Sequence, residues 1–247
     1  MRRQSTVAEA WTGRARRRHR LESLNRIEEA LLFQRQNRWD VEDRVLWKRS
    51  TDHYRANFCT KDIWKQLRSG SSKVSWYKGI WFTHSNPKYS FCTWLEVHGK
   101  LTTGDRMLLW NRGMQTSCVL CDSNVTETRD HLFFSCRFAA EIWRNLAKNI
   151  YKSRFFTNWS SLLVAISGQW QNNIESFVAR YLLQTAVHTI WGERNGRRHG
   201  ESPNSGTHLI QRIDKHVRNR ISVINARGDC RYDKAFQYWF QSRMGTN

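Results

Sequence analysis

The sequence is poor in proline and in acidic residues. Only 2 of its 247 residues are proline, whereas 13 are Trp and 12 are Phe. Disordered chains show the opposite bias, with few aromatic residues and many prolines. A chain of this length can also bury a sizeable core, as one large domain or as two small ones. We therefore expect most of the chain to fold.

Long apolar segments are missing as well. No apolar run approaches the roughly 20 residues of a membrane helix. Met1 is followed by Arg2, Arg3 and polar residues, where a secretory signal would have an apolar core. The sequence therefore predicts an intracellular protein with no membrane partner. In that reducing setting, clustered cysteines more often bind a metal than form disulfides.

The shortage of acidic residues gives the chain a net charge of +20, with a sequence pI near 10.4. Such an imbalance favours polyanionic partners. The excess is uneven: residues 101–150 carry +1, whereas residues 1–50, 51–100, 151–200 and 201–247 carry +4 to +6. We predict nucleic acid, RNA or DNA, as the partner, and no small-molecule substrate. The oligomeric state cannot be read from these features.

Several arginine clusters are candidates for phosphate contact. The first 20 residues contain seven Arg and one Glu. This run is either a solvated basic arm, or else a nucleic-acid arm or a nuclear import signal. The second interpretation predicts a nuclear location. The candidate nucleic-acid-binding residues are Arg16, Arg17, Arg18, Arg20, Arg197, Arg198, Arg218 and Arg220.

Three of the six cysteines lie within 19 residues, beside a histidine. The spacing is Cys-x2-Cys-x9-His-x4-Cys, formed by Cys118, Cys121, His131 and Cys136. Thiolate and imidazole ligands in this number suit a tetrahedral zinc ion. Catalytic zinc sites usually keep one position open for water, so four protein ligands predict one structural Zn²⁺. The alternative is a reduced cysteine pair with an unrelated core histidine.

The other cysteines, Cys59, Cys92 and Cys230, stand alone among apolar or aromatic neighbours. We expect them to be buried free thiols.

Apolar residues recur at helical spacing along most of the chain. Residues 21–36 and 173–193 show this pattern, and Leu209, Ile213, Val217, Ile221 and Ile224 form a clean stripe. Two short apolar segments within residues 43–58 favour a β-hairpin. The predicted fold class is mainly α: a helical domain with a small hairpin and one zinc knuckle, followed by C-terminal amphipathic helices.

The residues around the metal motif resemble a known family. The stretches that carry the resemblance are Phe58-Cys59-Thr60-Lys61-Asp62-Ile63-Trp64, Trp94-Leu95, Lys100-Leu101-Thr102-Thr103-Gly104-Asp105-Arg106-Met107, Cys118-Val119-Leu120-Cys121, Glu127-Thr128-Arg129-Asp130-His131-Leu132-Phe133-Phe134-Ser135-Cys136-Arg137-Phe138, Ile142-Trp143 and Ile190-Trp191-Gly192-Glu193-Arg194-Asn195. Together they resemble the reverse-transcriptase zinc-binding domain of plant LINE-type (non-LTR) retroelement proteins. One departure is that three residues, not two, separate Glu127 from His131.

The resemblance implies a domain organisation and a role. It places the zinc-binding domain at residues 58–150. Charge and apolar spacing divide the rest into a basic arm and helix at 1–36, a hairpin lead-in at 37–57 and a helical region at 151–247. The resemblance also implies the same four zinc ligands and a part in holding RNA template or target DNA. The chain has no polymerase-type Tyr-x-Asp-Asp. We therefore expect no enzymatic activity, and the chain looks like the C-terminal portion of such a protein.

A second function stays open. Because the metal-binding segment is the least basic, the zinc could serve the fold alone, in a structural or protein-interaction module.

Overall fold

The computed structural model describes residues 18–36, 45–121 and 123–244. It divides the chain into a first unit, residues 1–71, and a second unit, residues 72–247. Helices predominate in the described residues, beside one two-stranded hairpin and one Cys/His cluster. The predicted fold class is thereby confirmed.

The first unit is built from small elements. They are α2 (Glu22–Gln36), β1 (Trp47–Ser50), β2 (His53–Arg55) and α3 (Thr60–Leu67). The two strands pair antiparallel, with Trp47 opposite Arg55. The rings of Trp47 and Phe58 meet edge to face at 4.8 Å, and Arg49 pairs with Asp62 of α3 at 3.4 Å. Both strands are exposed and α3 has no buried residue, so these contacts lie near the surface.

The second unit contains most of the helices and all of the predicted metal ligands. Its elements are α4 (Tyr77–Ile80), α5 (Pro87–Val97), α6 (Gly104–Met107), the π-helical turn η1 (His131–Ser135), α7 (Arg137–Tyr151), η2 (Lys152–Arg154), α8 (Trp159–Ser167), α9 (Asn173–Arg198), α10 (Gly206–Ala226), η3 (Cys230–Tyr232) and α11 (Ala235–Met244).

Four of these helices begin at side chains that cap them. Asn86, Asn158, Asn172 and Ser205 precede α5, α8, α9 and α10, and each accepts a hydrogen bond from a backbone N–H of the first turn. Such caps satisfy donors that have no partner inside the helix. Pro87 suits the first position of α5, because its backbone nitrogen carries no proton that would need a hydrogen-bond acceptor.

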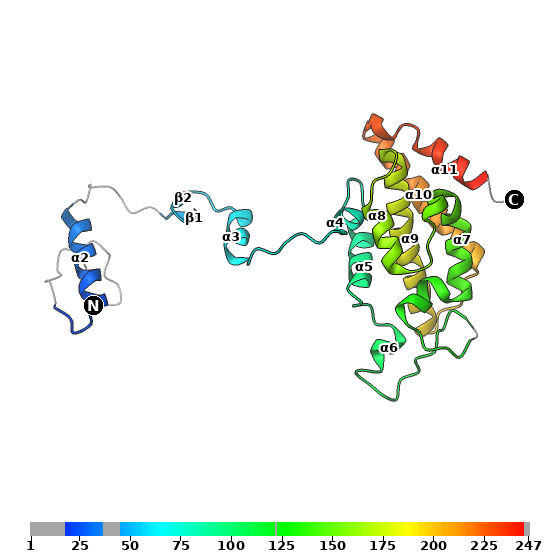
Figure 1. Ribbon diagram of the computed structural model, residues 1–247, viewed down its shortest axis with the longest axis horizontal. Coiled ribbons are helices and arrows are strands. Elements are labelled where there is room, and N and C mark those ends of the chain that lie inside the picture. The colour runs from blue at the N-terminus through cyan, green and yellow to red at the C-terminus, as the bar shows by residue number, and fades with distance from the viewer. Residues whose placement is uncertain (1–17, 37–44, 122, 245–247) are drawn as a thin grey trace. The chain divides into compact units, whose positions relative to one another are not determined.

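Helix α9 is the centre of the second unit (Figure 1). It lies between α5 and α7 and also contacts α10, α8 and α11. Its buried side chains point to several sides, from Phe177 and Tyr181 to Ile190. A helix that is buried nearly all round must be covered by neighbours on every side. The predicted stripe from Leu209 to Ile224 of α10 is fully buried in this core.

The expected boundary near residue 150 does not separate two cores. Trp143 and Tyr151 of α7, before the boundary, belong to the same apolar cluster as Trp159 of α8 and Leu182 of α9, after it. Residues 72–247 therefore form one unit, because α7 packs against both α9 and α10.

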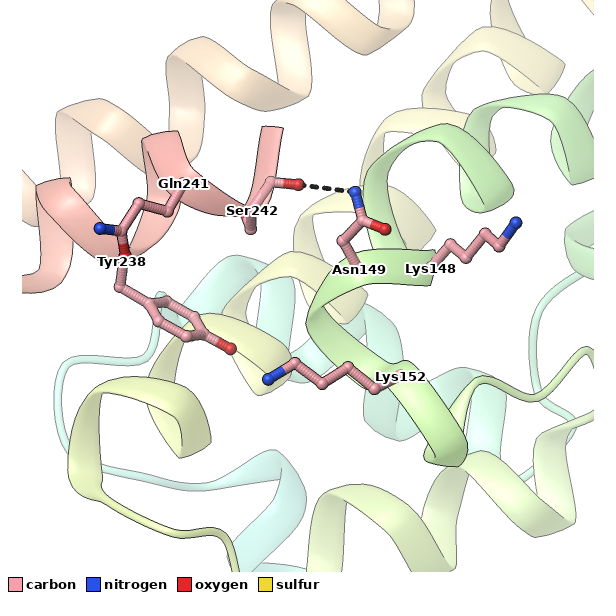
Figure 2. Close-up of a pocket in the computed structure, with 6 residues that line it drawn as sticks. All are labelled: Lys148, Asn149, Lys152, Tyr238, Gln241 and Ser242. Atoms are coloured by element: carbon pink, nitrogen blue, oxygen red, sulfur yellow. Dashed lines mark hydrogen bonds between the residues drawn. The ribbon is translucent and has the colours of Figure 1, made fainter. Parts of the chain in front are cut away.

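The last helix is held to α7 by polar contacts. The Asn149 side chain donates a hydrogen bond to the Ser242 carbonyl (3.0 Å), which Figure 2 shows at the edge of a pocket of about 570 Å³. Arg243 donates to the carbonyl and the side-chain oxygen of Asn145, each at 2.7 Å. The pocket is lined by two lysines, Lys148 and Lys152, and by uncharged polar side chains.

Among the helices that the structure describes, none has both the length and the apolar character needed to span a membrane.

One carboxylate is buried on the inner side of α5. Glu96 is 1% exposed, and neither of its carboxylate oxygens has a hydrogen-bond partner. Burial raises its pKa to about 8, and the Arg129 guanidinium, 3.6 Å away, opposes this rise only in part. A carboxyl with that pKa is mostly protonated at neutral pH.

We therefore expect Glu96 to make the folded state less stable as pH rises. The unfolded carboxyl ionises near pH 4.3, so between about pH 4.3 and 8 stability should fall by up to about 1.4 kcal/mol per pH unit. Glu96→Gln should remove this loss. In urea denaturation from pH 5 to 8, the unfolding free energy of Glu96→Gln should rise relative to that of the wild type as pH increases. Glu141→Gln, at an exposed site of α7, should show no such relative rise. A constant difference across that range would contradict the assignment.

Candidate metal centre

The four predicted ligands come together at one point of the second unit. The ligand atoms of Cys118, Cys121, His131 and Cys136 all lie within 4.8 Å of one another. Cys118 and Cys136 are buried, and the other two are partly exposed. It is the one group of three or more Cys, His, Asp or Glu residues in the described chain that could hold a metal ion.

The distances between ligand atoms suit a tetrahedral zinc ion. The sulfurs of Cys118 and Cys136 are 3.9 Å apart, and Cys121 Sγ lies 3.4 Å from His131 Nε2. With zinc–sulfur bonds of about 2.3 Å and zinc–nitrogen bonds of about 2.05 Å, a tetrahedron has edges of about 3.8 Å and about 3.6 Å. The donor set and its spacing therefore fit Zn²⁺.

A short turn presents the first two ligands. Cys118 N–H donates to the Val125 carbonyl (3.0 Å), and Glu127 N–H donates to the Thr116 carbonyl (2.8 Å). These bonds close residues 116–127 into a loop. The backbone N–H groups of Leu120 and Cys121 point at Cys118 Sγ. The N–H donors stabilise a thiolate, which is the form that binds zinc.

A π-helical turn presents the other two ligands. Cys136 N–H donates to the carbonyl of His131 (2.6 Å), five residues earlier, and this bond closes the turn η1. The wide turn brings residues five apart onto the same side, which is what the His-x4-Cys spacing requires. We call residues 116–136 the metal knuckle.

The side chains between His131 and Cys136 anchor the knuckle in the core. Leu132, Phe133 and Phe134 are buried. Both phenylalanine rings meet Trp159 edge to face, at 5.8 Å and 5.3 Å between ring centres. Burying an aromatic side chain of this size contributes about 1.5–3 kcal/mol. The ligands are therefore held by apolar packing as well as by backbone hydrogen bonds.

The two buried thiols influence each other's protonation. The Cys118 thiol donates to the sulfur of Cys136, which lowers the pKa of Cys136 and raises that of Cys118. Burial also raises the pKa of Cys118. Zinc binds thiolates, so its binding would release these protons and should weaken as pH falls.

A buried ion pair joins the knuckle to α9. Glu127 is 0% exposed and Arg194 is 3% exposed. Arg194 Nε donates to both carboxylate oxygens of Glu127, at 2.9 and 3.1 Å, and Arg194 Nη2 donates to the Thr102 carbonyl (2.8 Å). Gly104 N–H donates to the same carboxylate (3.1 Å). The network thus connects the knuckle, α6 and the C-terminal part of α9.

Gly104 is required by the closeness of the backbone at this point. A Cβ on Gly104 would lie 2.3 Å from the Thr116 carbonyl oxygen. Only glycine allows the start of α6 to lie this close to the knuckle.

Two predicted nucleic-acid-binding residues contact the knuckle. Arg197 donates to Glu193 (2.8 Å) and to the Asn204 carbonyl (3.0 Å), and its other nitrogen lies 3.4 Å from the carbonyls of Val119 and Leu120. Arg198 donates to the carbonyls of Gln115 (3.0 Å) and Ser117 (3.4 Å). Both guanidinium groups are mostly buried. The end of α9 therefore holds the backbone that carries the first ligand pair.

The other predicted arginines lie in different settings. Arg220 donates to the carbonyls of His84 (2.7 Å) and Ser85 (3.1 Å), so it holds the loop before α5. Arg218 is more open and pairs with Asp214 one turn away. Arg18 and Arg20 are exposed in the first unit, whereas Arg16 and Arg17 lie outside the described residues. Contact of any of these residues with nucleic acid stays a prediction.

The lone cysteines differ from expectation. Cys92 is buried on α5, as expected, but Cys59 and Cys230 are exposed. Both lie at element ends, Cys59 just before α3 and Cys230 at the start of η3, where the backbone turns at the surface.

A comparison with protein families matches residues 58–143 to the family described as zinc-binding in reverse transcriptase. The matched stretch contains all four ligands and Glu127, and the resemblance is confirmed for it. The link to plant LINE-type elements stays a prediction. Searches of curated proteins and of solved structures found no match.

Metal removal should loosen the knuckle. Structural zinc supplies about 10–16 kcal/mol in isolated finger peptides, and in a domain with its own packed core the share should be smaller. We expect the pure, reduced protein to contain one zinc by inductively coupled plasma mass spectrometry. Cys118→Ser or chelation should lower the unfolding free energy and increase hydrogen exchange over residues 116–136.

Cys230→Ser is the matched control for this experiment, because Cys230 is an exposed thiol outside the cluster. It should keep the zinc and the stability of the wild type. A zinc-free wild-type protein would overturn the assignment of the centre.

The buried ion pair should be costly to break. Arg194→Ala leaves the Glu127 carboxylate buried without its charged partner, which typically costs about 3–5 kcal/mol. Arg218→Ala removes an exposed partner of Asp214 and should cost less than about 1 kcal/mol. Urea denaturation of the zinc-loaded variants measures both. Equal effects of the two substitutions would contradict the role given to Glu127 and Arg194.

Proposed function

We propose that this chain, whose residues 58–143 match a family described as zinc-binding in reverse transcriptase, is a non-catalytic module that binds nucleic acid. The zinc ion would hold the knuckle on α9, and basic side chains elsewhere on the surface would contact phosphates. In this proposal the chain derives from a retroelement protein.

The observation that carries the proposal is the charge that remains on the surface. Residues 72–247 contain 24 Lys and Arg but only 12 Asp and Glu. Three of those acidic side chains, Glu96, Glu127 and Glu193, are buried. The guanidinium groups of Arg194, Arg197 and Arg198 are mostly buried as well, so the accessible surface keeps the full cationic excess that the sequence shows. A surface of this kind attracts nucleic acid through phosphate contacts.

The knuckle itself is a poor candidate for these contacts. Arg197 and Arg198 contact the backbone that carries its first ligand pair, and both are already bound to backbone carbonyls or carboxylates. Their hydrogen bonds would have to break before they could reach a phosphate. The proposal therefore assigns phosphate contact to basic side chains elsewhere on the protein.

The alternative function is a structural or protein-interaction module. The observation that favours it is an exposed apolar loop between α6 and the knuckle, which presents Leu108, Leu109, Trp110 and Met114. Contiguous exposed apolar side chains often mark a protein contact. Under this alternative the zinc serves the fold alone, and nucleic acid does not bind.

Salt dependence distinguishes the two functions. We expect the full-length, zinc-loaded protein to bind a fluorescent RNA or DNA 20-mer in an anisotropy titration. With four phosphate contacts on a single strand, affinity should fall about 50-fold between about 50 and 200 mM salt, since the slope is about −0.7 per contact. Absent binding, or an affinity that does not change with salt, would refute the proposal.

Charge variants test which basic side chains contact the phosphates of the nucleic acid. Arg18→Glu with Arg20→Glu changes two exposed residues and should weaken binding and flatten the salt slope. Arg197→Gln is the control, because it should lower stability through the lost Glu193 and Asn204 contacts while leaving the slope unchanged. The alternative function predicts that none of these variants affects nucleic acid.

A further inference from the structure

Helix α5 presents a row of aromatic side chains on its outer face. Phe91 stacks on Trp94, with ring centres 5.6 Å apart and 21° between the planes. Trp94 meets the His98 ring at 4.8 Å, and His98 meets Trp76, from the segment before α4, at 5.4 Å. We call these four residues the aromatic ladder. Its outer member, Phe91, is 52% exposed.

The ladder is not part of the core. The opposite face of α5, with Tyr89, Cys92 and Thr93, is buried and packs against α9. The ladder positions follow one another at i, i+3 and i+7, so they share the face that the core does not use. Large aromatic side chains at the surface need an explanation when they form a continuous row.

The accessible charges of the segment that carries the ladder, residues 72–104, are all positive. Residues 72–104 contain four lysines, Lys73, Lys78, Lys88 and Lys100, all exposed. The one acidic residue in this segment is Glu96, which is buried. Lys88 lies one helical turn before Phe91, on the same face of α5. The row of rings is therefore accompanied by cations and by no accessible carboxylate of its own segment.

This combination matches one class of partner. Single-stranded nucleic acid offers unpaired bases that stack on aromatic rings and phosphates that pair with lysines. Double-stranded nucleic acid keeps its bases stacked inside the helix, so it could use the lysines only. A protein partner of ordinary composition would gain from the rings but would have to desolvate the lysines.

We propose that the aromatic ladder is a stacking platform for single-stranded nucleic acid, with Lys88 and Lys100 contacting the phosphates. This inference rests on the proposed function and adds to it the strand form and the surface. The bases would stack on the outer rings, Phe91 first, while the backbone follows the lysines.

The test compares single-stranded and duplex oligonucleotides of the same sequence, measured by anisotropy with the full-length, zinc-loaded protein. Phe91→Ala and Trp94→Ala should each weaken single-strand binding about 5- to 150-fold, the usual loss for one stacked base. Duplex affinity should stay within twofold of the wild type. Trp94→Phe should keep most of the single-strand affinity, because the ring is retained. Lys88→Gln should reduce the salt slope by about 0.7.

Phe240→Ala is the matched control. Phe240 of α11 is also an exposed phenylalanine that stacks on a neighbour, Phe236, at 6.1 Å. The Phe240→Ala substitution should leave single-strand affinity unchanged. Thermal melting confirms that each variant is folded, and Phe91→Ala, at a half-exposed site, keeps the test valid if Trp94→Ala unfolds.

The outcomes separate the two proposals. Wild-type protein that binds single strands equally well with and without Phe91 overturns the platform and leaves the proposed function intact. Wild-type protein that binds no oligonucleotide overturns both. If Phe91→Ala changes only the molar mass measured by light scattering, the ladder is a protein interface and the platform is wrong.

Discussion

The ion pair between Glu127 and Arg194 is the interaction on which the second unit most depends. A carboxylate with no solvent contact is stable only if charged and polar partners replace its water. Arg194 supplies the charge and also donates to the Thr102 carbonyl, while Gly104 supplies a backbone donor. Because these partners come from α9 and from the start of α6, the pair fixes where the knuckle lies before any metal is considered.

The metal centre and the apolar core support each other through the knuckle. One end of the knuckle is held by backbone hydrogen bonds and by the arginines at the end of α9, and the other by Phe133 and Phe134 against Trp159. The ligand atoms are thus brought within tetrahedral distance by contacts outside the coordination sphere. Such a preformed arrangement reduces the conformational entropy that metal binding must overcome.

The same contacts explain which of the charged side chains are used inside the fold and which remain at the surface. The three arginines at the end of α9 are used internally, and two of the buried carboxylates, Glu127 and Glu193, are their partners. The lysines around α5 have no such partners among the acidic residues of their own segment. Arginine suits the internal role because its planar group makes several directed hydrogen bonds at once, whereas lysine is a mobile, strongly hydrated charge. The arginines at the end of α9 therefore serve the fold, whereas the lysines of residues 72–104 lie at the surface.

The sequence by itself determined the candidate ligand cluster, the helical class and the hairpin. Ligand spacing and apolar periodicity are local, so Cys118 to Cys136 and the stripe of α10 could be recognised without coordinates. The single core of residues 72–247, the pairing of Glu127 with Arg194, and the engagement of Arg197, Arg198 and Arg220 were decided only by the tertiary structure. These contacts join residues far apart in the chain, and neither charge counts nor periodicity encode which distant groups will meet.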